Sequence, residues 1–307
     1  MSETRILPAE PDGIAEAARL IGAGQPVALP TETVYGLAAD ATNGEAVARI
    51  YAAKGRPSFN PLIVHVLDVD AAARIATFDD RALALAVRYW PGPLTMVLPL
   101  RSDGPVSALV TAGLSTIALR VSAHPVMRAV LAATGLPLAA PSANASGAIS
   151  PTRAAHVLAS LDGRIPLILD GGPTAHGLES TIVAVDDRGL RLLRHGPIPA
   201  EALGAAALSS GPIEAPGQLA SHYAPSKPLR LDATEAGPDE WLIGFGPVAG
   251  NVSLSPNGDL VEAAARLFDL LHDADRRSPR RIAVAPIPDS GLGAAINDRL
   301  TRAAAPR

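Results

Sequence analysis

The chain has 307 residues, a length at which two domains are more usual than one core, and its 48% hydrophobic and 18% charged residues are typical of a globular protein. Its net charge of −4 provides no bulk attraction to nucleic acid or anionic membranes, and 3% aromatic residues argue against a protein that stacks single-stranded bases. The absence of cysteine excludes disulfides, thiolate zinc sites and cysteine nucleophiles.

The apolar runs of the chain bear on its location. Residues 1–13 contain no apolar stretch typical of a secretory signal. No apolar run approaches the roughly 18 residues that a membrane span needs. We therefore expect a cytoplasmic protein with no membrane partner.

Short apolar runs alternate with amphipathic segments up to about residue 200. Strands or apolar runs are predicted at 26–30, 62–67, 94–100, 116–121, 136–140, 167–169, 181–185 and 190–193. Helices are predicted from Asn43 or Gly44 to Ala53 with Gly55 as the stop, at 80–90, at 125–134, and to about Leu161 with Ser150 as N-cap and Pro151 in the first turn. This alternation predicts an α/β layer fold.

The pattern changes near residue 208. Residues 209–227 contain Gly, Pro and Ser without periodicity and are predicted to form a linker. Strands at 241–245 and 282–285 and helices at 259–271 and 293–304 then predict a second α/β unit of about 80 residues. We expect a first domain at 1–207, a linker at 208–228 and a C-terminal domain at 229–307.

The familiar phosphate-binding motifs are absent. The chain has no GxxxxGK[ST] motif, which excludes a P-loop enzyme, and no GxGxxG motif after its first strand, which makes a dinucleotide-binding fold a poor interpretation. It has no HExxH motif and no tight carboxylate cluster. If phosphates bind, scattered cations, hydroxyls and backbone groups must hold them.

Lysine is rare and occurs in unusual places. Only two of the 26 basic residues are lysines, Lys54 and Lys227. Lysine is a compact point charge, whereas arginine is a planar fork, so a chain that prefers arginine can retain lysine where a phosphate needs a point charge. Lys54 and Arg56 are separated by one glycine, and both can point at one anion. Chance survival of the two lysines is the alternative.

Three other loops beside strands carry polar groups, at 30–37, 139–147 and 177–181, and Arg194-His195-Gly196 follows the last of them by one strand. Each alone also fits a cap or a turn, and Tyr35 in the first loop also fits a hydrogen-bonded buried tyrosine. His65, within a strand, is by itself more typical of a packed core. Arg120 at the end of a predicted strand indicates a carboxylate partner, which a substrate can supply.

Together these loops resemble the threonylcarbamoyl-AMP synthase family of the YrdC-like superfamily over nearly the whole chain. The matching segments of the first domain are PTETVYGLAADA, KGRP with NPLIVHV, PSANASG, and LESTIV with the following RHG. LSPNGDLVEAAARLF and GLGAAINDRLTRAA resemble the C-terminal domain of the two-domain members, and HYAP resembles their linker motif. The resemblance implies a YrdC-like twisted mixed sheet with flanking helices, plus a small C-terminal α/β domain that is Rossmann-like.

The resemblance also implies a reaction. L-threonine, bicarbonate and ATP would give threonylcarbamoyl-AMP and pyrophosphate, and a separate transferase complex would use the adenylate to make threonylcarbamoyladenosine next to the anticodon of tRNA. Attack of a carbamate oxygen on the α-phosphate needs positioning and charge stabilisation but no enzyme nucleophile. Mg²⁺ would accompany ATP and lie mainly on phosphate oxygens, and no protein ligand for it is assigned.

Site residues follow from the same resemblance. Lys54 and Arg56 are expected to be catalytic. The expected ATP site comprises Lys54, Arg56, Asn60, Thr116, Ser142, Asn144, Ser150, Arg194 and Tyr223. The expected threonine site comprises Thr33, Tyr35, His65, Arg120, Ala140 and Ser180. His65 is a candidate general base, although the substrate carbamate can react without one.

Two alternatives remain open from the sequence. An RNA-binding maturation factor would use a concave basic surface known in relatives of this fold, but the net charge and scarce aromatics weaken that interpretation, and direct tRNA binding is not decided. Carbamoyl transfer of the hydrogenase-maturation type would bring zinc-finger cysteines and acylphosphatase segments, which this chain lacks. For the linker, the family places the motif at His222 and Tyr223 over ATP, which predicts a lid instead of a solvated tether.

Overall fold

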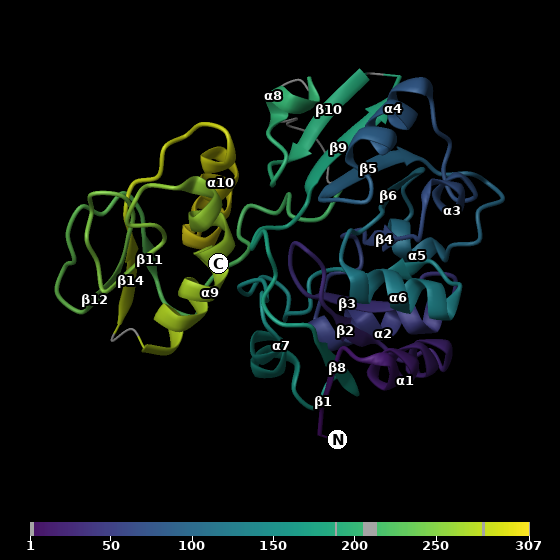
Figure 1. Cartoon of the computed structure of the whole chain (residues 1–307), viewed down its shortest axis with the longest axis horizontal. Helices are drawn as coiled ribbons and strands as arrows, with labels where there is room; N and C mark the ends of the chain where they lie inside the picture. The colour runs from purple at the N-terminus through teal and green to yellow at the C-terminus, as the bar shows by residue number, and fades with distance from the viewer. Residues whose placement is uncertain (1–2, 188, 205–213, 278–279, 307) are drawn as a thin grey trace.

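The computed structural model describes residues 3–187, 189–204, 214–277 and 280–306. Two units lie side by side, and helices α9 (Leu260–Arg277) and α10 (Leu292–Ala304) of the smaller unit face the larger one (Figure 1). The predicted boundary at 207/208 lies outside the described residues. No helix in the described part of the chain is long and apolar enough to cross a membrane.

In the larger unit, the described strands form one mixed sheet in the order β1-β8-β2-β3-β7-β4-β6-β5-β9-β10. Their bounds are β1 (Arg5–Pro8), β2 (Val27–Leu29), β3 (Gly36–Asp40), β4 (Ile63–His65), β5 (Leu94–Pro99), β6 (Thr116–Arg120), β7 (Leu138–Ala139), β8 (Leu167–Asp170), β9 (Thr181–Asp186) and β10 (Gly189–Arg194). The central strands β4 and β6 are parallel, with His65 opposite Arg120, while β7 is antiparallel to β4 and to β3. The mixed α/β sheet with flanking helices that the sequence predicted is confirmed.

Local capping chemistry sets several of the helices. Those of the larger unit are α1 (Pro11–Gly22), α2 (Gly44–Lys54), α3 (Val69–Ala73), α4 (Asp80–Tyr89), α5 (Ala108–Thr111), α6 (Pro125–Thr134), α7 (Ala154–Leu161) and α8 (Ala200–Leu203). The Asn43 side chain accepts from the backbone amides of Glu45 and Ala46, and Gly55 ends α2 with φ of 59°, a left-handed conformation that glycine adopts without strain. Helix α6 has the predicted bounds.

One predicted cap is wrong. Helix α7 begins at Ala154 with Arg153 in the cap position, three residues later than the prediction from Pro151. The Ser150 hydroxyl instead donates a hydrogen bond to the carboxylate of Glu179, a residue 29 positions away. A long-range partner therefore replaces the local cap. The prediction also missed β1, α1 and β3 and the short helices α3, α5 and α8.

The smaller unit is a parallel sheet covered by two helices. Its strands β11 (Leu229–Arg230), β12 (Glu240–Gly244), β13 (Val252–Ser253) and β14 (Arg281–Val284) lie in the order β11-β14-β12-β13. Its apolar core continues into the larger unit, because Val34, Ile149, Leu178 and Tyr223 belong to the same buried cluster as the apolar faces of α9 and α10. The two units therefore share a packed interface beside three loops that the sequence singled out.

Candidate active site

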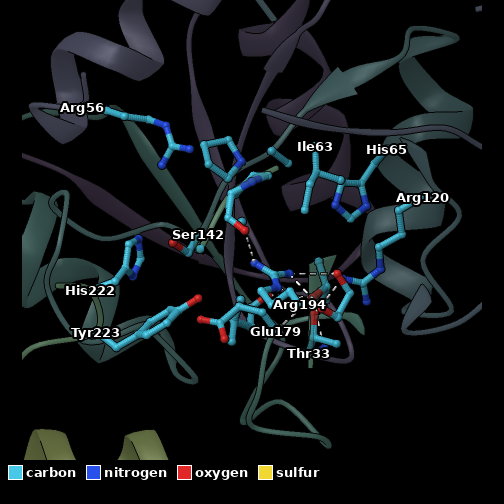
Figure 2. A pocket seen from close by; sticks show the side chains of 18 residues that line it. Thr33, Arg56, Ile63, His65, Arg120, Ser142, Glu179, Arg194, His222 and Tyr223 are labelled. Atoms are coloured by element: carbon cyan, nitrogen blue, oxygen red, sulfur yellow. Dashed lines mark hydrogen bonds between the residues drawn. The ribbon is translucent and has the colours of Figure 1, made fainter. Parts of the chain in front are cut away.

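A small pocket lies at the strand ends, where the loops and the linker meet, and most of the residues that line it are polar or charged. Figure 2 shows His222 and Tyr223 on one side, His65 and Arg120 on the other, and Arg194 and Glu179 between them. Its volume is about 40 Å³, room for a few water molecules and far below the roughly 300–1,000 Å³ of sites for small molecules. In this structure the pocket is therefore too small for such a ligand.

Sheet topology brings the predicted residues together. His65 and Arg120 end two adjacent parallel strands, and Arg194 ends β10 at the edge of the sheet. The pocket is lined by nine of the residues predicted for the two sites, namely Thr33, Arg56, His65, Arg120, Ala140, Ser142, Ser180, Arg194 and Tyr223. Six others do not line it, namely Tyr35, Lys54, Asn60, Thr116, Asn144 and Ser150.

Lys54 lies behind the pocket wall. Its buried Nζ donates to the carbonyl oxygens of Ser142 at 2.5 Å and Asn144 at 2.6 Å. Burial, and then the charge of Arg56, lower the pKa of Lys54. Lys54 thus fixes the 142–144 loop, in an arrangement that the point-charge argument did not anticipate.

Arg56 reaches the pocket itself. Its Nε donates to the carbonyl of Asn60 at 3.2 Å and its Nη2 to that of Pro61 at 3.0 Å. Burial lowers the pKa of Arg56 to about 10, so the guanidinium stays charged at neutral pH. Asn60 therefore supports Arg56 through its backbone.

Tyr35 and Thr116 lie away from the pocket. The Tyr35 hydroxyl donates to the carbonyl of Gly172 at 2.8 Å and accepts from the amide of Gly171 at 3.2 Å, and burial raises its pKa. The alternative of a hydrogen-bonded buried tyrosine is confirmed. Thr116 begins β6, four residues or roughly 13 Å before Arg120 on the same strand.

Arg120 already has a carboxylate partner within the chain. Its Nη2 lies 2.7 Å from Oε1 of Glu32, and its Nη1 donates to the Thr33 hydroxyl at 2.8 Å. Ser122 donates its hydroxyl to the same carboxylate. Burial acts to raise the pKa of Glu32, but Arg120 and Ser122 outweigh it and lower the value to about 2. The carboxylate that the sequence analysis assigned to a substrate is, in this structure, that of Glu32.

His65 is buried beside this ion pair, and its Nδ1 has no hydrogen-bond partner within the described residues. Burial, and then the Arg120 charge, lower the pKa of His65 to about 3. The ring is therefore neutral at physiological pH and a weak proton acceptor, which argues against its use as a general base.

Arg194 and Glu179 form the floor between the two sides. Arg194 donates from Nε and Nη2 to the carbonyl of Ser180, at 3.0 and 2.9 Å, and from Nη1 to that of Pro216 in the linker at 3.4 Å. Glu179 accepts from the Ser150 hydroxyl and, at 2.8 Å, from Nε of Arg299 in α10. Glu32, Glu179 and Arg299 were not predicted as site residues.

The linker contributes one side of the pocket. Tyr223 is buried with φ of 62°, and no described residue bonds its hydroxyl. At Gly217 a Cβ would lie 2.7 Å from that hydroxyl and 2.9 Å from Cδ of Arg194, so only glycine fits without displacing them. The Nδ1 of His222 is also buried and has no hydrogen-bond partner in the part of the chain that the structure describes. Unpaired polar atoms on both sides of the pocket fit a site for a polar ligand.

The chain is similar to known proteins over nearly its whole length. A family model described as "Telomere recombination" matches residues 19–196, and one described as "Threonylcarbamoyl-AMP synthase, C-terminal domain" matches residues 192–305. A threonylcarbamoyl-AMP synthase of Bacillus subtilis is 40% identical, covering 96% of this chain and 93% of that protein. One of Pyrococcus abyssi is 38% identical, covering 94% and 92%.

A solved structure agrees over both units. The crystal structure of P. abyssi Sua5 complexed with L-threonine matches with a TM-score of 0.90 and 35% identity over 98% of each chain. The fold and the pocket define a two-domain YrdC-like enzyme. The chain belongs to the threonylcarbamoyl-AMP synthase family, as its sequence motifs indicated.

Proposed function

We propose that the pocket makes threonylcarbamoyl-AMP and pyrophosphate from L-threonine, bicarbonate and ATP. The observation that carries the proposal is the gathering of Arg56, Arg120 and Arg194 in one pocket of a chain without cysteine. Bicarbonate and the threonine amine give a carbamate with loss of one water molecule, and a carbamate oxygen then attacks the α-phosphate of ATP and displaces pyrophosphate. Preorganised cations can stabilise the charge that develops in that step.

The threonine side is proposed at the ends of β4 and β6. Arg120 would bind the threonine carboxylate, and the Glu32 ion pair would hold its guanidinium in place. Thr33, His65 and Ser180 line the same region. The relative solved in complex with L-threonine supports this choice of ligand. Tyr35 would affect threonine binding only indirectly, through its hydrogen bonds to the backbone of Gly171 and Gly172.

The ATP side is proposed around Arg56, Ser142, Arg194 and Tyr223. In its charged form Lys54 has three Nζ protons, of which two are used on carbonyl oxygens and the third would be left for a phosphate oxygen. An approaching phosphate would favour the charged form of Lys54 despite its burial. Asn60, Asn144 and Ser150 would support this side from behind the wall.

Mg²⁺ is proposed to enter with ATP. The pocket carboxylate Glu179 is engaged with Ser150 and Arg299, and Glu32, behind Arg120, is engaged with Arg120 and Ser122. Among the described residues, no group of three or more His, Asp or Glu side chains is placed to hold a metal. These donors fit an ion carried on phosphate oxygens better than a resident one.

The product is proposed to serve tRNA modification. A separate transferase complex would take the threonylcarbamoyl group to tRNA, and a cytoplasmic location follows, because ATP and tRNA occur there. The family finding favours this enzyme over an RNA-binding maturation factor.

Pyrophosphate release tests the proposal. Purified protein is incubated with Mg-ATP, and threonine and bicarbonate are omitted in turn, with mass spectrometry of the adenylate. Release that requires both co-substrates is expected. Absence of the adenylate, or release that is indifferent to threonine, would overturn the proposal, and tRNA binding without synthesis would favour the RNA-binding alternative.

A further inference from the structure

One side chain of the C-terminal domain touches three segments of the site. Arg299, on α10, has 0% exposure. Its Nε donates to Oε2 of Glu179 at 2.8 Å, and its Nη2 donates to the carbonyl of His195, after β10, at 2.8 Å. Its guanidinium carbon lies 5.1 Å from the centre of the Tyr223 ring in the linker. These contacts bring together the 177–181 loop, the turn after β10 and the linker.

Glu179 connects Arg299 to Ser150. The other carboxylate oxygen of Glu179 accepts the hydroxyl of Ser150, which has 0% exposure. A second residue of the C-terminal domain, His272, places its Nε2 3.1 Å from the Ser150 carbonyl. The C-terminal domain thus contacts Ser150 directly at its carbonyl and, through Glu179, at its hydroxyl.

Close packing makes this arrangement rigid. Val34, Ile149 and Leu178, the neighbours of Thr33, Ser150 and Glu179, belong to the apolar core of the C-terminal domain. At Gly177, whose φ is 68°, a Cβ would lie 2.4 Å from the carbonyl oxygen of Ala264 in α9. A small shift of α9 or α10 would therefore move the loops that carry the site.

We propose that the C-terminal domain completes the catalytic site through Arg299, a positioning residue that fixes Glu179 and, through it, the Ser150 hydroxyl on the ATP side. The inference rests on the function proposed above. Arginine suits the role because its rigid fork can serve Glu179, the His195 carbonyl and Asp298 at once, whereas lysine has one nitrogen.

The test compares Arg299→Gln and Arg299→Lys with the native chain in the pyrophosphate assay. Both variants should raise KM for ATP by about tenfold or more, the scale on which outer-shell partners act in metal sites. KM for threonine should change less than threefold, because Arg299 contacts none of the residues at the ends of β4 and β6. Arg153→Gln is the control, since it breaks an exposed pair between the domains, Arg153 with Asp269, without touching Glu179.

A double-mutant cycle separates positioning from simple destabilisation. Arg299→Gln leaves the buried Glu179 carboxylate without its cation, and Glu179→Gln leaves Arg299 paired with Asp298 alone. The double variant pairs two neutral amides at this contact and should recover part of the ATP affinity. Arg299→Gln added to Ser150→Ala should cost little further ATP affinity.

The outcomes are distinguishable. If the native chain makes no adenylate, the proposed function fails. If it does, and folded Arg299 variants keep the native KM for ATP, the inference is overturned. It is also overturned if both KM values rise in proportion to the loss in Tm, as a merely structural residue would produce. If Arg299→Gln does not fold, Arg299→Lys and the double variant give the same decision.

Discussion

Arg120 and Glu32 form a buried ion pair with 2.7 Å between Nη2 and Oε1, at the point where β6 ends beside His65. The pair removes the net charge of Arg120 but fixes its direction, because Thr33 and the Gly92 carbonyl accept from its other nitrogens. A threonine carboxylate would meet an oriented donor instead of a free cation.

Glu32→Gln tests this orientation. An uncompensated Arg120 in a buried site should lower the free energy of unfolding by about 3 kcal/mol or more. KM for threonine should rise about tenfold, the scale on which outer-shell partners act in metal sites, while KM for ATP stays near the native value. Denaturant unfolding and steady-state kinetics measure the two effects. An unchanged KM for threonine in a folded variant would show that Glu32 has only a structural role.

Arg120→Ala tests the proposed threonine contact directly. The variant should lose threonine binding strongly, while its ATP affinity, measured by calorimetry, should remain near native. Arg101→Ala is a suitable control, because that arginine lies on the surface in a pair with Asp103. Equal losses for ATP and threonine would place Arg120 with the phosphates.

Lys54→Arg tests the point-charge argument in its corrected form. The lysine ammonium fits between two carbonyl oxygens at 2.5 and 2.6 Å, a space that a guanidinium cannot enter without moving the 142–144 loop. Lys54→Ala should reduce kcat by about a hundredfold or more, and Lys54→Arg should also be poor. Lys227→Arg, at the only other lysine, should be near native. Near-native turnover of Lys54→Arg would refute the argument.

The pKa of His65 predicts a pH dependence of stability. Its folded pKa of about 3 lies below the unfolded value, so the neutral ring favours the fold above about pH 6.5. As pH falls from there towards 3, the unfolded state gains a proton first, and stability should fall by about 1.4 kcal/mol per pH unit for this residue. His65→Asn should reduce the slope of unfolding free energy against pH. An NMR titration midpoint near 6 for His65 would contradict this prediction.

Local chemistry was readable from the sequence, and long-range pairing was not. The cap at Asn43 and the stop at Gly55 predicted α2 because both act within a few residues. The Ser150 cap failed because Glu179 competes for the same hydroxyl in the folded chain. Glu179 and Arg299 are 120 residues apart, and no local pattern marks such a partnership.

The pocket likewise combines features that the sequence predicted with pairings that it did not. The resemblance placed Arg56 and Arg194 in the ATP site and Arg120 in the threonine site, and the structure brings all three to the wall of one pocket. The resemblance did not indicate that Lys54 would donate to backbone carbonyls or that Glu32 would form an ion pair with Arg120. Those arrangements depend on which loops meet in space, which only the folded sheet decides.

The linker provides the last prediction, since four of its residues line a pocket too small for ATP. Entry of ATP therefore requires Pro216, Gly217, His222 and Tyr223, which line the pocket, to move aside. A lid of this kind would protect the labile adenylate from water. Tyr223→Ala should keep the fold but leak the adenylate faster, measured by its hydrolysis during turnover.

Limited proteolysis distinguishes a lid from a tether. Tyr223 is 1% exposed in the closed structure, so chymotrypsin can cut there only after opening. ATP with threonine should therefore slow cleavage at Tyr223, whereas either ligand alone should protect less. Truncation after Leu208 should leave a folded first domain, because the main core of that domain contains no residue beyond Leu203. The truncated protein should have little synthesis activity. Cleavage that ignores both ligands, together with full turnover of the truncated protein, would show that the segment is only a tether.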